Sequence, residues 1–168
     1  MKAKVSIIMG STSDLPVMEK AAKVLNEFKI PFEIHALSAH RTPEEVEKFA
    51  KGAYSRGIKA IIAGAGMAAH LPGVIAAMTP IPVIGVPINA SLDGMDALLS
   101  IAQMPPGIPV ATVGINGAMN AGILAGQMLA IGDSELQKNV IEFKESLKEK
   151  IVKANEELSA IQYDFKTN

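Results

Sequence analysis

His40 and Arg41 are the neighbouring residues with the clearest potential for chemistry, and they lie in the segment Ser38–Glu45. An imidazole with an ordinary pKa of about 6.5 can both accept and release a proton at neutral pH. A guanidinium is always charged, and its rigid fork of donors suits a phosphate or a carboxylate. The pair therefore indicates proton transfer beside an anionic ligand.

The residues that follow this pair predict the start of a helix. Thr42 is of the type expected at the N-cap, Pro43 at the first helical position, and Glu45 as the reciprocal partner of a capping box. Upstream, Phe32–Leu37 has the length and alternation of a strand. Ser38–Arg41 is then a short turn between the carboxyl end of a strand and the amino end of a helix. Ligands of open α/β sheets bind at such turns.

A second loop, Gly10-Ser11-Thr12-Ser13-Asp14, follows an apolar run and leads into a helical pattern. Its backbone amides, its hydroxyls and the helix dipole favour an anion such as a phosphate. Ser13 or Asp14 is the expected helix cap, and plain capping remains the alternative explanation for the cluster. Asp14 only accepts hydrogen bonds, so beside a phosphate it would bind sugar hydroxyls. The spacing matches neither a dinucleotide fingerprint nor an ordinary P-loop.

Gly64–Gly73 is a third segment, in which small residues succeed one another after an apolar run. Such residues let the backbone approach a flat ligand, and their amides can bond to it. Tight packing of a helix on the sheet is the alternative explanation. His70 lies in this segment and either orients the loop or touches the ligand. His35 is expected to face solvent or a neighbour and receives no role.

Short apolar runs alternate with helical patterns along the chain, as a parallel sheet with crossover helices requires. Five runs are predicted as buried strands: Val5–Met9, Phe32–Leu37, Ala60–Ala63, Val83–Val86 and Val110–Val113. Five helices are predicted between and after them: Leu15–Phe28, Pro43–Ser55, Leu71–Met78, Asp96–Ala102 and Ala118–Leu129. No linker or repeat interrupts the 168 residues. We therefore expect one domain, a three-layer α/β/α sandwich with a parallel sheet.

A long capped helix is predicted over residues 133–160, beyond the core at 1–132. Apolar side chains recur along one of its faces: Leu136, Val140, Phe143, Leu147, Ile151 and Leu158. A helix of about 25 residues is roughly 37 Å long, more than a domain of this size covers with its own surface. We hypothesise that the far half packs on a neighbouring subunit, the alternative being that it lies on its own domain or frays. A hydrophobic content of 49% also favours a homo-oligomer.

Composition argues against several partners and sites. A net charge of -1 and 4% aromatic residues without Trp offer no basic footprint and few stacking platforms, so nucleic acid is not expected. There are no cysteines, and no histidines or carboxylates have metal-ligand spacing, so no metal site is expected. The apolar run after Met1 is too short for a signal peptide or a membrane span. A cytoplasmic protein without membrane contact is expected.

In order and spacing, the stretch from about Val5 to Ala130 resembles the 5-(carboxyamino)imidazole ribonucleotide mutase family of purine biosynthesis. The matching segments are Gly10–Asp14, Ser38–Pro43, Ala63–Gly66 with Ala68–Gly73, and Gln103–Pro105. The resemblance implies a flavodoxin-like subunit that assembles into an octamer. It also implies a cofactor-free isomerisation of a small ribonucleotide, in which a carboxylate moves from the exocyclic nitrogen to a ring carbon of an aminoimidazole.

The resemblance also implies roles for individual residues. His40 matches the general acid and base of the family. Ribose-phosphate binding is implied for Ser11, Asp14, Ser38 and Arg41. Contact with the imidazole and the migrating carboxylate is implied for Ala65, Gly66 and Leu71, and a supporting role for Gly10, Ser13 and His70. Met67 departs from the pattern where we expect glycine, and a left-handed backbone there would be costly.

Two other functions remain open at this point. A related branch of the family uses carbon dioxide directly, but it carries lysine at the position of Arg41 and lacks the Ala68–Gly73 run. The mutase is therefore preferred. A non-catalytic module that binds a sugar phosphate would need Ser11 and Arg41 but would tolerate the loss of His40.

Overall fold

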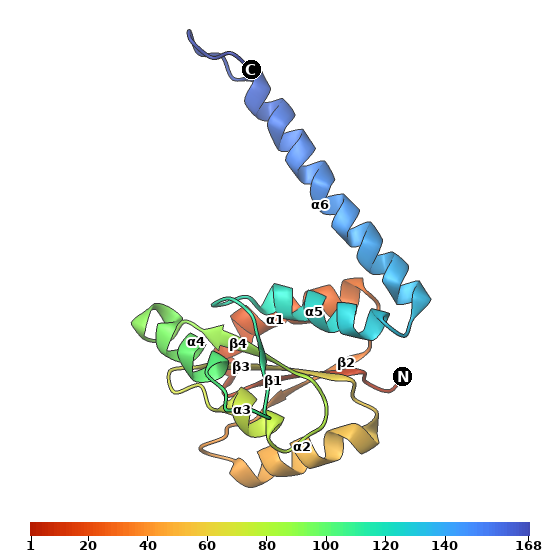
Figure 1. Ribbon diagram of the computed structural model, residues 1–168, viewed down its shortest axis with the longest axis vertical. Helices are drawn as coiled ribbons and strands as arrows, with labels where there is room; N and C mark the ends of the chain where they lie inside the picture. The colour runs from red at the N-terminus through yellow and green to blue at the C-terminus, as the bar shows by residue number, and fades with distance from the viewer.

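Five parallel strands form one sheet in the computed structural model, which describes all of residues 1–168 (Figure 1). The strands are β1 Val5–Met9, β2 Phe32–Ala36, β3 Ala60–Gly66, β4 Val83–Ile88 and β5 Ala111–Thr112. Their order in the sheet is β2-β1-β3-β4-β5, and every neighbouring pair is parallel. This order is that of flavodoxin-like proteins, so the predicted fold class is confirmed.

Helices cover both faces of the sheet. One face carries α1 (Leu15–Glu27) and α5 (Ala118–Ala130). The other carries α2 (Pro43–Arg56), α3 (Leu71–Ala76) and α4 (Met95–Ala102). Two short 3₁₀ turns, η1 (Thr12–Asp14) and η2 (Leu92–Gly94), precede α1 and α4, and α6 (Ser134–Ala160) follows α5.

The continuous apolar runs are explained by burial on both faces of the sheet. Successive side chains of a strand point to opposite faces. In β1, Ile7 joins the core beneath α1 and α5, whereas Ile8 joins the core beneath α2, α3 and α4. Both side chains are 0% exposed. Burying each of them fully stabilises the fold by roughly 1.5–3 kcal/mol.

Some boundaries differ from the sequence prediction. β5 is shorter than predicted because it pairs with β4 only through Ala111 and Thr112. Pro109, just before it, has no N–H to donate to a ladder. β3 is longer than predicted and runs to Gly66, since Ala65 and Gly66 pair with the end of β4. The first small residues of Gly64–Gly73 are therefore strand, and the loop begins only after them.

The far half of α6 projects away from the rest of the chain (Figure 1). Leu136 and Val140 are its only buried residues, and the Phe143 ring packs edge-on against Phe28 with centroids 5.3 Å apart. Beyond Phe143, apolar side chains are exposed, including Ile151 at 65%. Only the first part of α6 therefore packs on its own domain. No helix, α6 included, is long and apolar enough to cross a membrane.

A polar cluster joins β1, β2 and α2. The Ser6 hydroxyl donates to Glu33 over 2.6 Å, and the Arg56 guanidinium donates to both Glu33 oxygens over 2.8 and 3.0 Å. Arg56 also lies 5.1 Å from the Phe49 ring centroid, and the His35 ring packs against the same ring at 5.7 Å. His35 therefore lies between β2 and α2, with its side chain 41% exposed to solvent and its ring against Phe49.

Gly85 of β4 has no room for a side chain, because a Cβ there would lie 2.3 Å from Ile101 Cγ2 and 3.0 Å from Val110 Cγ1. Both neighbours are β-branched and cannot move aside easily. We predict that Gly85→Ala lowers the free energy of unfolding by about 1–3 kcal/mol, measured by urea denaturation. The control is Gly52→Ala in α2, where a Cβ meets nothing within 4 Å. It should stabilise by about 0.5–1 kcal/mol. Equal stability of the two variants would contradict the packing described.

Glu33 should make stability depend on acid pH. Partial burial alone would raise its pKa, but hydrogen bonds from Ser6 and Arg56 and the charge of Arg56 outweigh burial and lower the pKa below the ordinary value of 4.5. A lowered pKa stabilises the fold above pH 4.5, and this contribution is lost as pH falls through the folded-state pKa. We predict that Glu33→Gln makes the unfolding free energy less dependent on pH below 4.5. Glu19→Gln, at an exposed pair with Lys23, is the control and should leave the slope unchanged.

Candidate active site

Three loops meet at one edge of the sheet because the strands that precede them are parallel neighbours. Gly10–Asp14 follows β1, Ser38–Thr42 follows β2, and Met67–His70 follows β3. The carboxyl ends of all three strands therefore lie side by side. The structure brings together the three segments that the sequence singled out, at the edge where α/β proteins of this kind bind ligands.

Arg41 ties the first two loops together. Its terminal nitrogen donates to the Gly10 carbonyl over 2.7 Å, and its Nε donates to the Ser38 hydroxyl over 3.3 Å. The Ser38 hydroxyl also accepts the Arg41 backbone N–H over 3.2 Å. A guanidinium has five N–H donors, so most of its donors remain free for a ligand. Arg41 is thus held in place by the protein and still presents its charge to the surface.

Thr42 does not form the predicted capping box. It occupies the N-cap position of α2, but its side chain makes no cap hydrogen bond. Its hydroxyl instead accepts from the Ser38 N–H over 3.0 Å and donates to the Ser38 carbonyl over 3.1 Å. The side chain is therefore used to close the turn that carries His40 and Arg41. Pro43 is the first helical residue, as predicted.

His40 and His70 face each other across the second and third loops. The His40 Nε2 and His70 Nδ1 atoms are 2.7 Å apart, and the two rings are nearly perpendicular at 87°. One nitrogen must donate a proton and the other must accept it. The His70 ring therefore lies against the His40 ring and can fix its orientation, a contact that the sequence did not predict. Both side chains are exposed, so the pair is open to a ligand.

The first loop is shaped by a 3₁₀ turn rather than by a direct helix cap. The Ser11 hydroxyl accepts the Ser13 N–H over 3.3 Å and caps η1. Asp14 stands at the N-cap position of α1, as predicted, but its side chain makes no cap hydrogen bond. Partial burial raises the pKa of the Asp14 carboxyl, against the lowering effects of Ser11, Ser13 and Arg41. The carboxyl remains available for a ligand.

The small residues at the end of β3 allow close packing, which is one of the two explanations that the sequence left open. A Cβ on Gly64 would lie 2.4 Å from the Met18 sulfur, so this glycine lets α1 pack on the sheet. Ala65 is 8% exposed and Leu71 only 3%, whereas Gly66 is half-buried at the strand end. The side chain of Leu71 belongs to the core, which leaves only its backbone for contact with a ligand. Gly66 is the position where a ligand could approach the backbone closely.

Met67 has a left-handed backbone, with φ of 54°. The sequence identified this conformation as costly for any residue other than glycine, and a left-handed L-residue costs roughly 1–2 kcal/mol. The side chain is 58% exposed, so the core does not repay that cost.

Sequence reasoning missed two further loops at the same edge. The η2 turn after β4 contains Leu92 at φ 44°, Asp93 at φ 52° and Gly94 at φ 82°. Asn116, after β5, has φ of 57°. The Asp93-Gly94 and Asn116-Gly117 pairs are strong turn signals and could have identified both loops.

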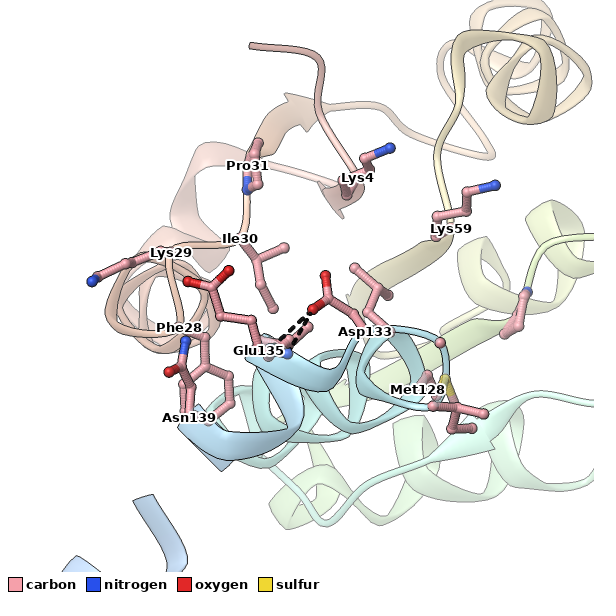
Figure 2. Close-up of a pocket in the computed structure, with 15 residues that line it drawn as sticks. Lys4, Phe28, Lys29, Ile30, Pro31, Lys59, Met128, Asp133, Glu135 and Asn139 are labelled. Atoms are coloured by element: carbon pink, nitrogen blue, oxygen red, sulfur yellow. Dashed lines mark hydrogen bonds between the residues drawn. The ribbon is translucent and has the colours of Figure 1, made fainter. Parts of the chain in front are cut away.

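A large cavity lies at the opposite, amino edge of the sheet (Figure 2). Its volume is about 800 Å³, and its lining includes Lys4, Ile30, Lys59 and Asp133. The Asp133 carboxylate is already used, because it accepts the Glu135 and Leu136 N–H groups at the start of α6. No histidine lines this cavity and no predicted site residue lies in it. The volume of this cavity would make it the candidate ligand site, but the residue types that line it do not. The side chains suited to catalysis lie at the carboxyl edge.

No three His, Asp or Glu side chains gather closely enough to hold a metal ion. The groups that converge at the carboxyl edge are instead suited to an anion and to proton transfer. Arg41 and the Ser11 turn offer donors, Asp14 offers an acceptor, and the His40–His70 pair can take and give a proton.

Comparisons with known proteins show the family to which the chain belongs. The family described as AIR carboxylase matches residues 4–150. The N5-carboxyaminoimidazole ribonucleotide mutase of Pyrococcus abyssi is 60% identical over 146 residues, which cover 86% of this chain and 84% of that protein. The mutase of Thermotoga maritima is 55% identical over 161 residues, covering 95% of this chain and 94% of that protein.

Two further relatives show the range of the similarity. A phosphoribosylaminoimidazole carboxylase of Candida glabrata is 56% identical over 164 residues, yet this chain spans only 29% of its length. The crystal structure of Treponema denticola PurE has a TM-score of 0.81 and 32% identity, covering 92% of this chain and 97% of that one. With a family match over most of its length and relatives of more than half identity, the chain belongs to the AIR carboxylase family.

Proposed function

We propose that this protein is a mutase of purine biosynthesis that converts N5-carboxyaminoimidazole ribonucleotide into its C4-carboxylated isomer. The observation that carries the proposal is the His40–His70 contact of 2.7 Å at the sheet edge that also presents Arg41 and the Ser11 turn. The names of the Pyrococcus and Thermotoga relatives support the choice of substrate.

The phosphate and ribose would bind at the first two loops. The η1 turn with its hydroxyls at Ser11 and Ser13, and the free donors of Arg41, suit the phosphate. Asp14 is acceptor-only and suits the ribose hydroxyls. Ser38 would act mainly by holding Arg41, since its hydroxyl already accepts two N–H groups from that residue.

The aminoimidazole would then lie between His40 and the end of β3. Charged His40 gives a proton to the carbamate nitrogen as the C–N bond breaks, which releases carbon dioxide and the free aminoimidazole ribonucleotide. The ring carbon attacks the carbon dioxide and forms the new C–C bond. Neutral His40 removes the proton from that carbon, so the ring regains its aromaticity and His40 regains its charge. The proton balance is zero, as an isomerisation requires.

His70 and the small residues have supporting parts in this scheme. Through its Nδ1, His70 holds the Nε2 edge of His40 in one orientation and can share its proton. Ala65 and Gly66 bring backbone close to the ring without bulky side chains. Carbon dioxide held in such a restricted space reacts at a high effective concentration.

The second candidate is a carboxylase that uses carbon dioxide directly on the aminoimidazole ribonucleotide. The name of the Candida relative favours it, although that protein is more than three times as long as the matched region. Supplying the purified protein with each substrate separates the two. Rapid conversion of N5-carboxyaminoimidazole ribonucleotide alone supports the mutase, and turnover only with aminoimidazole ribonucleotide plus bicarbonate supports the carboxylase. Binding without turnover of either would indicate a sugar-phosphate-binding module.

His40→Asn tests the assignment of the proton-transfer group. We predict that kcat falls on the order of 10²–10⁴-fold, because general acid–base catalysis contributes that much. Binding of the product ribonucleotide, measured by calorimetry, should change little, since the phosphate loop is intact. His35→Asn is the matched control, because His35 lies between β2 and Phe49 and should not affect turnover. An active His40→Asn enzyme would refute the assignment.

We also propose that the protein is a cytoplasmic homo-oligomer, an octamer, whose subunits associate through the far half of α6. The exposed Leu147, Ile151 and Leu158 support this, because together they leave an apolar surface without a partner in the chain.

Truncation after Lys148 tests the part played by α6. We predict a lower mass by light scattering, because the exposed apolar surface of the far half is removed. The midpoint of thermal unfolding, measured in a diluted sample, should change proportionally less than the mass does, because the buried part of α6 is retained. Truncation after Ala160, which keeps the whole helix, is the control and should keep the mass. An unchanged mass after Lys148 would rule out this role of α6.

A further inference from the structure

Backbone strain is concentrated at the carboxyl edge of the sheet. Five non-glycine residues have a positive φ, and four of them follow β3, β4 or β5: Met67, Leu92, Asp93 and Asn116. The fifth, Lys29, lies at the opposite edge, after α1. Strained residues of this kind persist only where the surrounding structure holds them, and they cluster at functional sites. Asn116 is the one whose side chain makes a hydrogen bond to another loop.

Asn116 links the loops after β4 and β5. Its side-chain oxygen accepts the Asn89 N–H over 3.0 Å, and its own N–H donates to the Pro87 carbonyl over 2.8 Å. The second bond is between backbone atoms and needs no particular side chain. Only the first depends on the asparagine, so the side chain has one specific task, which is to fix the chain at Asn89.

The chain fixed in this way forms the wall beside Gly66. Gly66 pairs in register with Ile88, the residue before Asn89. A Cβ built on Gly66 would lie 2.9 Å from Ala90 Cβ and 3.1 Å from the Ile88 carbonyl oxygen. Ala90 therefore lies directly against the Gly66 backbone. A shift of Asn89 and Ala90 would change the space in which Gly66 and Met67 can move.

We propose that Asn116 is a positioning residue for the reaction, which acts by holding Asn89 and Ala90 against Gly66. The inference rests on the proposed function, in which the Gly66 backbone lies against the reacting imidazole. The hydrogen bonds of Asn116 go to Asn89 and Pro87, and none goes to His40 or to the Gly10–Asp14 loop. Its loss should therefore affect the placement of the reacting group and leave the phosphate contacts unchanged.

Asn116→Gly is the sharpest test, because glycine accepts the positive φ and keeps the backbone bond while it removes the side-chain oxygen. Asn89 is an exposed residue whose N–H can bond to water once the side-chain oxygen is gone, so the fold should remain stable. We predict faster amide hydrogen exchange at Asn89, Gly66 and Met67. We also predict a fall in kcat on the order of ten- to a hundredfold with little change in KM, because a small misplacement near the chemistry has effects of this size.

Two control variants separate positioning from general damage. Asn116→Asp keeps an oxygen acceptor and a residue that tolerates a left-handed backbone, so it should restore protection from exchange. Lys29→Gly relieves the same φ at the opposite edge and should leave exchange at Gly66 and kcat unchanged.

The readouts also separate this inference from the proposed function. The role of Asn116 would be overturned if Asn116→Gly had the same amide exchange rate at Gly66 as the wild type. It would also be overturned if exchange were faster but kcat were unchanged. Neither result would affect the proposed mutase activity. An inactive wild-type protein would overturn the proposed mutase activity. The amide exchange rates would still show whether Asn116 holds Asn89 and Ala90 against Gly66.

Discussion

The hydrogen bond from Arg41 to the Gly10 carbonyl is the interaction on which the site depends most. Parallel strands bring the loops after β1 and β2 to one edge, but adjacency alone does not fix how the loops lie. The guanidinium joins them, and Ser38 and Thr42 close the turn that carries it. A hydrogen bond to a charged donor contributes about 1.5–3 kcal/mol, and less where water competes, as it does at this exposed residue. The Arg41–Gly10 hydrogen bond therefore contributes more to the arrangement of the two loops than to the stability of the fold. In this arrangement, His40 lies within hydrogen-bonding distance of His70.

The types of side chain and the volume of the cavity indicate ligand sites at opposite edges of the sheet, and the types of side chain are the stronger criterion. The cavity beside α6 is large because α5, the start of α6 and the amino ends of β1 and β3 leave a gap between them (Figure 2). Its lysines are surface residues and its carboxylate at Asp133 already caps a helix. The carboxyl edge holds the Arg41 guanidinium, the Asp14 carboxyl and the imidazoles of His40 and His70. The proposed isomerisation must move one proton and retain carbon dioxide, and only the second set of groups suits that chemistry.

Much of this arrangement could be predicted from the sequence, for physical reasons that differ between residues. Buried parallel strands have continuous apolar runs, which identified β1, β3 and β4. β2 was identified by its length and alternation, but the prediction that it is buried is wrong, because it is the edge strand of the sheet. Pro43 marked the start of α2. The prediction of a capping box was wrong because the Thr42 hydroxyl can bond either to the first turn of α2 or to the Ser38 backbone, and it bonds to the Ser38 backbone. The His40–His70 contact could not be predicted, since it joins residues 30 positions apart through loop geometry. The bond between Asn116 and Asn89 was missed for the same reason, although the Asn-Gly turn signal was present.

The most direct test of the account is a crystal structure of the protein with the product, the C4-carboxylated aminoimidazole ribonucleotide. The account predicts the phosphate at the Ser11 turn and Arg41, and the carboxylated ring between His40 and Gly66. A ribonucleotide bound instead in the cavity between Lys4, Lys59 and Asp133, with the carboxyl edge empty, would contradict it.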